Sequence, residues 1–100
     1  MMNRTVNMAL QVLPQAGGKT SYEMIDVAIG IIQQSGVKYR VCPFETVMEG
    51  SFDELMEIVA KVHEACFDAG TESMMTYIKI ESHAGKPAMI EEKMKKYEQE

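Results

Sequence analysis

Four segments of the chain alternate between apolar and polar residues, which is the pattern of a β-strand with one buried face. The first covers residues 4–13, and the other three are expected over residues 37–42, 46–49 and 73–81. In the first strand, the apolar set is Val6, Met8, Leu10 and Val12, and the polar side carries Thr5, Asn7, Ala9 and Gln11. The turn residues Pro43–Phe44 separate the second strand from the third, so we expect these two to form a hairpin.

Two longer segments place apolar residues at the spacing of an amphipathic helix. The first runs from about Ser21 to Gly36, and the second runs from Ser51 to Gly70. Each opens on a capping box, in which a serine or threonine precedes a glutamate by three positions, and each stops at a glycine. Residues 87–97 predict a short additional helix, because a proline stands at its expected first turn.

The resulting order, β-α-β-β-α-β with a tail helix, predicts an α+β fold of the ferredoxin-like type, with a four-stranded antiparallel sheet and one domain over residues 1–100. The fourth strand is expected beside the first, the first beside the third, and the third beside the second. Both helices cover one face of the sheet and leave the other bare. Counted by alternation along each strand, the bare face should carry Asn7, Ala9, Gln11, Thr46, Met48, Tyr77 and Lys79.

The composition and charge of the chain limit the classes of partner that such a domain is expected to bind. The 100 residues are 46% hydrophobic and 25% charged, which is ordinary for a globular chain, and the formal net charge of -5 makes nucleic acid an unexpected partner. No apolar run is long enough to cross a membrane. Two cysteines without a signal peptide predict free thiols and a cytoplasmic protein. A domain this small gains stability by covering its bare sheet face, so we expect it to associate with copies of itself.

Several short motifs, in register along residues 4–97, resemble the small thiamine-binding protein family. They are Leu13-Pro14, Ser21, Ser35-Gly36-Val37-Lys38-Tyr39, Pro43-x-x-Thr46-x-x-Glu49-Gly50 and Thr76-Tyr77-Ile78-Lys79-Ile80. The resemblance implies a ferredoxin-like fold, dimers or tetramers made by packing sheet faces, and binding of thiamine or its pyrimidine moiety. Basic residues that family members often carry around the fourth strand are absent here, so a phosphate-binding role is not expected.

Thiamine joins a permanently charged thiazolium ring to an aminopyrimidine that donates and accepts hydrogen bonds. Glu49 is the candidate counter-charge, and a buried carboxylate would balance the cation. Polar contacts to the pyrimidine are expected from Asn7, Gln11 and Thr46, and an aromatic surface from Tyr39 or Tyr77. The alternative is that Glu49 only stabilises the start of the following helix through the helix dipole.

Other titratable residues have plainer explanations. Lys79 stands between two isoleucines in a central part of the fold and needs a partner, which is either the ligand or a carboxylate, Glu45 or Glu49. His63 and Cys66 share one face of the second helix, but a zinc site needs three or four ligands. We therefore expect them to be core residues, and we expect no metal and no cofactor.

The sequence thus favours a non-enzymatic, homo-oligomeric protein that binds thiamine or a related pyrimidine. One rival is a structural or regulatory oligomer whose bare face serves assembly alone. The other is an enzyme that uses Glu49 as a general base, for which the chain offers no identifiable partner acid.

Overall fold

The computed structural model describes residues 4–17, 19–85 and 95. Along these residues the chain forms seven elements: β1 (Thr5–Ala16), β2 (Lys19–Thr20), α1 (Tyr22–Ser35), β3 (Lys38–Val41), β4 (Thr46–Ser51), α2 (Phe52–Asp68) and β5 (Ser73–Glu81). The helix expected over residues 87–97 lies outside the described residues, apart from Lys95.

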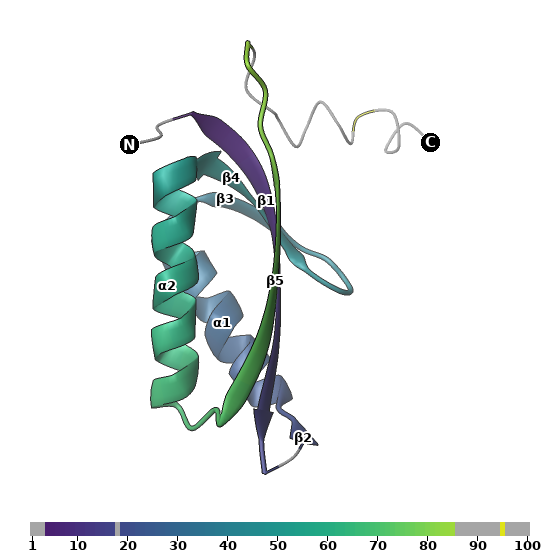
Figure 1. Cartoon of the computed structure of the whole chain (residues 1–100), viewed down its shortest axis with the longest axis vertical. Helices are drawn as coiled ribbons and strands as arrows, with labels where there is room; N and C mark the ends of the chain where they lie inside the picture. Colours follow the sequence, from purple (N-terminus) through teal and green to yellow (C-terminus); the bar gives the residue numbers. More distant parts are fainter. Residues whose placement is uncertain (1–3, 18, 86–94, 96–100) are drawn as a thin grey trace.

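The long strands form an antiparallel sheet in the order β5-β1-β4-β3, and the two-residue β2 pairs with the end of β1. Both helices lie on the same side of this sheet, as Figure 1 shows. The ferredoxin-like α+β fold and the strand order expected from the sequence are therefore confirmed.

The helix ends follow from local side-chain contacts. Ser21 caps α1 by accepting a hydrogen bond from the backbone nitrogen of Met24 at 3.3 Å, and Ser51 caps α2 by accepting one from Glu54 at 3.2 Å. These bonds satisfy backbone donors that have no partner within the helix. Gly36 ends α1 with a φ of 84°, a left-handed conformation that glycine adopts without strain.

β1 is longer than the sequence predicted, because we expected a loop from Pro14 onward. Proline lacks a backbone donor, but its carbonyl oxygen still accepts a hydrogen bond from the backbone nitrogen of Ser21 at 3.1 Å. Beyond it, Gln15 pairs with Thr20 across the β1–β2 turn and with Ser73 of β5. The extension brings the start of α1 against the end of β1.

The core lies between the sheet and the two helices. Its residues are Val6, Met8, Leu10, Ala28, Ile32, Met48, Leu55, Ile58, Val59, Val62 and Cys66. Met8 and Met48 stand opposite each other in the two central strands, and both are fully buried. The alternation predicted for β1 therefore places its apolar side against the helices.

The prediction for β4 was wrong by one position. Residues directly opposite each other in an antiparallel pair point to the same face, and the register pairs Met8 with Met48 and Leu10 with Thr46. Thr46 and Met48 thus face the helices, and Val47 takes the bare face. Because Val47 and Met48 are both apolar, alternation within this short strand does not decide its orientation.

This orientation predicts unequal costs for truncating two adjacent residues. Met48→Ala should lower the free energy of unfolding by about 2–5 kcal/mol, since it opens a cavity in the core. Val47→Ala, on the partly exposed bare face, should cost clearly less. Urea denaturation of both variants measures the difference, and equal losses would contradict the register.

Candidate functional site

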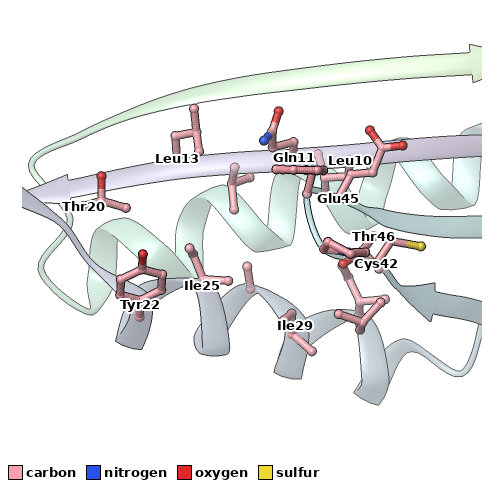
Figure 2. A pocket seen from close by; sticks show the side chains of 16 residues that line it. Leu10, Gln11, Leu13, Thr20, Tyr22, Ile25, Ile29, Cys42, Glu45 and Thr46 are labelled. Carbon is pink, nitrogen blue, oxygen red and sulfur yellow. The ribbon is translucent and has the colours of Figure 1, made fainter.

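A cavity of about 260 Å³ lies between the sheet and α1, at the end of the sheet where the β3–β4 turn lies (Figure 2). Its walls come from β1, from Thr20 and most of the length of α1, and from the β3–β4 turn with the strand ends beside it. The lining residues are Leu10, Gln11, Val12, Leu13, Thr20, Tyr22, Ile25, Ala28, Ile29, Ile32, Val41, Cys42, Pro43, Phe44, Glu45 and Thr46.

Two periodic patterns make this cavity apolar. Leu10 and Val12 are alternate residues of β1 on its helix-covered side. From α1, the residues Ile25, Ala28 and Ile29 share one face at spacings of three and four. These two apolar surfaces face each other across the cavity. A small flat ring could enter between them without disrupting the hydrogen bonds of any buried charged group.

The turn between β3 and β4 forms the rim at one end of the cavity. The backbone nitrogen of Cys42 donates to the carbonyl oxygen of Glu45 at 2.9 Å, which holds the turn tight. Pro43 and Phe44 occupy its tip, and the Phe44 side chain is 81% exposed. An exposed aromatic ring is thereby held at the rim of an apolar cavity.

At the other end, Thr20 and Tyr22 stand at the entry to α1. The Tyr22 side chain is 78% exposed although it lines the cavity. Tyr22 and Phe44 are thus two largely exposed aromatic residues that line the cavity at its opposite ends. Sequence analysis did not identify either residue. The pattern that could have indicated them is that Phe44 follows a proline in a turn and that Tyr22 is the first residue of a capped helix.

The polar character of the cavity comes from hydroxyl groups rather than charges. Thr46 is only 6% exposed and belongs to the helix-facing side of β4. Figure 2 shows the side chains of Gln11 and Glu45 pointing away from α1, toward the bare side of the sheet. Among the described lining residues, Glu45 is the one carboxylate, so no charged group points into the cavity from them.

The residues predicted to bind the ligand divide between the two sides of the sheet. Register pairs Asn7 with Glu49 and Gln11 with Tyr77, and these four residues share the bare face with Lys79. A second recess of about 330 Å³ lies on that face, and Asn7 and Lys79 are among its lining residues.

The other two predicted residues lie on the helix side. Tyr39 stands opposite Met48 at the edge of the sheet, and Thr46 lines the cavity. The structure therefore brings five of the seven predicted residues together on the bare face, and it separates Thr46 and Tyr39 from them. Only Gln11 and Thr46 of the seven also line the cavity.

Lys79 has a partner on the bare face. Its Nζ lies 3.3 Å from Oε1 of Glu45, which agrees with the expectation of a pair with Glu45 or Glu49. The lysine side chain is 74% exposed, so the pair contributes little to stability, about 0–1 kcal/mol. Its effect is to hold the Glu45 carboxylate on the side of the sheet away from the cavity.

His63 and Cys66 are packed into the fold, as the sequence predicted. His63 Nδ1 lies 2.8 Å from the carbonyl oxygen of Val59 and must carry the proton, because a carbonyl only accepts. Nε2 lies 2.9 Å from the hydroxyl oxygen of Thr76, which donates to it when the ring is neutral. The Cys66 thiol donates to the carbonyl oxygen of Met24 at 3.6 Å, and burial raises the pKa of that thiol.

Residues 4–17, 19–85 and 95 offer neither a metal site nor a membrane-spanning helix. They contain no group of three or more His, Cys, Asp or Glu side chains that could hold a metal ion. Over the same residues, no helix is both long enough and apolar enough to span a membrane.

The fold and the cavity define a small ferredoxin-like domain with an apolar recess between sheet and helix. The model of the thiamine-binding protein family matches residues 8–98, and the chain belongs to that family. A UPF0045 protein of Clostridium perfringens is 41% identical over 93 residues, covering 93% of this chain and 97% of the relative. The family predicted from the sequence motifs is therefore confirmed.

Solved structures agree with this assignment. A domain of unknown function, DUF77, from Bacillus cereus is 42% identical, with a TM-score of 0.89 over 96% of this chain and 92% of that one. A protein of Thermotoga maritima described as a proposed thiamine biosynthesis/salvage protein is 32% identical, with a TM-score of 0.84 over 93% and 98% of the two chains.

The two cysteines should differ in reactivity. Cys66 is fully buried, and its thiol pKa is raised. A smaller fraction of this thiol is therefore in the reactive thiolate form at a given pH than for an ordinary cysteine. Cys42 is partly exposed at the cavity. We expect iodoacetamide at neutral pH to label Cys42 first, and Cys66 only after denaturation, as read by peptide mass spectrometry. Faster labelling of Cys66 in the native protein would contradict this packing.

Proposed function

We propose that this chain is a non-enzymatic binding protein that holds thiamine, or a related aminopyrimidine, in the cavity between β1, α1 and the β3–β4 turn. The observation that carries the proposal is the pairing of an apolar cavity with a buried hydroxyl, Thr46, and with two exposed aromatic rings at its rim. Membership of the thiamine-binding protein family supports the choice of ligand.

The chemistry of the ligand matches these groups. An aminopyrimidine has flat apolar faces, which suit the aliphatic walls from β1 and α1, and polar edges, which a hydroxyl can meet as donor or acceptor. The thiazolium ring is cationic and should remain toward the opening. There the ring of Phe44, at the turn, or that of Tyr22, at the helix start, offers a face for a cation–π contact, worth about 0.5–2 kcal/mol.

The same walls support a binding role over catalysis. General acid–base catalysis needs a titratable side chain within reach of the reacting atoms. The described lining residues include no histidine, lysine or aspartate, and the Glu45 side chain points to the other face of the sheet. A hydroxyl and a partly exposed thiol without a neighbouring base provide recognition but little activation.

A second candidate location is the bare face, where Asn7, Gln11, Glu49, Tyr77 and Lys79 lie together as the sequence predicted for a site. There the cation would be balanced by a carboxylate instead of aromatic rings, either Glu49 or one of the two that line the recess on this face, Glu45 and Glu81. The observation that favours it is the recess of about 330 Å³ between β4, β1 and β5. A second copy of the chain would be needed to enclose a ligand there.

We further infer that the bare face is covered by another copy, in a homodimer or homotetramer. Its centre carries small or apolar residues, Ala9 and Val47, and its margins carry both signs of charge, with Glu49 near Lys38 by register. A two-fold axis through such a surface can set acidic groups against basic ones. If the face served assembly alone, the protein would be the structural oligomer that the sequence left open.

Isothermal titration with thiamine tests the cavity directly. Thr46→Val keeps the shape of the side chain and removes the hydroxyl, and it should weaken binding by roughly two- to tenfold, the value of one hydrogen bond, 0.5–1.5 kcal/mol. Phe44→Ala should weaken it by a similar amount without touching the core, because that ring is exposed.

The matched control is Glu49→Gln, which changes the bare face and leaves the cavity intact. The cavity proposal predicts unchanged affinity for this variant. A loss confined to Glu49→Gln would move the site to the bare face, and no saturable heat with the unaltered protein would leave the structural oligomer as the function.

A further inference from the structure

Glu45 borders two recesses at once. It lines the cavity between the sheet and α1, and it also lines the recess of about 330 Å³ on the bare face. Among the described residues, no other lines both. The carboxylate of Glu45 therefore stands at a boundary, where the orientation of one side chain decides which of the two recesses receives a negative charge.

The β3–β4 turn fixes the backbone of Glu45 but not its side chain. The carbonyl oxygen of Glu45 accepts the hydrogen bond from the backbone nitrogen of Cys42 at 2.9 Å, so the main chain is held in place. The Glu45 side chain is 30% exposed, and packing does not enclose it. Side chains of this kind exchange rotamers in picoseconds to nanoseconds, so the carboxylate can turn to either recess without any rearrangement of the turn.

Lys79 decides between these orientations. Its Nζ lies 3.3 Å from Oε1 of Glu45, although β1 runs between the strands that carry the two residues. Register sets Lys79 beside Ala9, and Ala9 beside Val47, so the pair reaches across two strand spacings, about 9–10 Å. The small side chain of Ala9 leaves room for the lysine to cross the bare face and hold Glu45 there.

The pair leaves the cavity without a counter-charge. With Glu45 turned away, a ligand meets aliphatic walls, the hydroxyl of Thr46 and aromatic rings at the ends. An uncharged ring loses nothing by this arrangement, whereas a cation lacks a carboxylate that stands one rotation away. Because Lys79 is 74% exposed, the pair is weak, and a single substitution is enough to release the carboxylate.

We propose that Lys79 is a positioning residue that sets the preference of the cavity between cationic and uncharged ligands. By holding Glu45 on the bare face, it keeps the counter-charge away from a thiazolium ring and leaves the binding of an uncharged aminopyrimidine unaffected. The inference rests on the proposed function, since it concerns the same cavity. Lys79 itself makes no contact with the ligand.

A purely structural role for the pair has a different consequence. If Lys79 only braced the turn, its loss would loosen the rim of the cavity and weaken every ligand alike. Positioning of Glu45 instead changes the relative affinity for a cation and for an uncharged ring. The ratio of two dissociation constants therefore separates the two roles, and it is insensitive to a change in folding or association that affects both ligands equally.

Isothermal titration with thiamine and with its hydroxymethyl pyrimidine, which has the same ring without the cation, measures this ratio. Lys79→Met keeps most of the aliphatic side chain and removes the charge. We expect thiamine to bind roughly two- to tenfold more tightly, the value of one charged contact at a partly exposed rim, and the pyrimidine to change by less than about twofold.

Two further variants identify the carboxylate as the cause. Glu45→Gln should cost more thiamine affinity in the Lys79→Met background than in the unaltered chain, because only in that background is the carboxylate released. Ala9→Leu leaves every charge in place but obstructs the path of the lysine across β1. It should shift the ratio in the same direction as Lys79→Met.

The matched control is Lys38→Met, which removes the same charge from the same face. Register sets Lys38 opposite Glu49, and neither residue lines the cavity, so the ratio should not change. An unaltered ratio in Lys79→Met, an equal shift in Lys38→Met, or an equal cost of Glu45→Gln in both backgrounds would overturn the inference. By contrast, no saturable heat with either ligand in the unaltered protein would reject the proposed function itself, and this inference with it.

Discussion

The structure depends on the position of β1, which is hydrogen-bonded on both sides, to β4 and to β5. Its register sets Met8 against Met48 in the core and Asn7 against Glu49 on the bare face. Since side chains alternate with a period of two, a slip of one residue would exchange the two faces. Burial of Met8 and Leu10 under the helices holds the register, because the slipped arrangement would expose them and bury polar neighbours.

That register divides the sheet into two chemically different sides. The helix side combines aliphatic residues with the hydroxyl of Thr46 and opens at the β3–β4 turn. The bare side carries the charges, and the pair between Lys79 and Glu45 keeps a carboxylate there that could otherwise have turned toward the cavity. A flat ligand with polar edges is suited to the first side, and a charged partner surface to the second. The two proposed roles, ligand binding and assembly, therefore use opposite sides of the same strands.

Local signals in the sequence were enough for both helices, but not for β2 or for the extension of β1 to Ala16. The cap at Ser51 is the predicted one, whereas α1 is capped at Ser21, one residue after Thr20, which the capping box with Glu23 indicated. The orientation of β4 was not available locally, because Val47 and Met48 are equally apolar and only pairing with β1 distinguishes them. Sequence analysis did not identify Tyr22 and Phe44 for a related reason. They are distant in sequence, and they line the same cavity only once α1 has packed against the sheet.

The strand order also decides whether assembly and binding can coexist. The cavity opens beside α1 and the β3–β4 turn, whereas β5 lies at the opposite edge, with β1 and β4 between β5 and β3 (Figure 1). A copy packed on the bare face covers Gln11 and Glu49, whose side of the sheet faces away from the cavity. The proposed bare-face contact would therefore leave the cavity accessible to the proposed ligand, because the sheet separates the two surfaces.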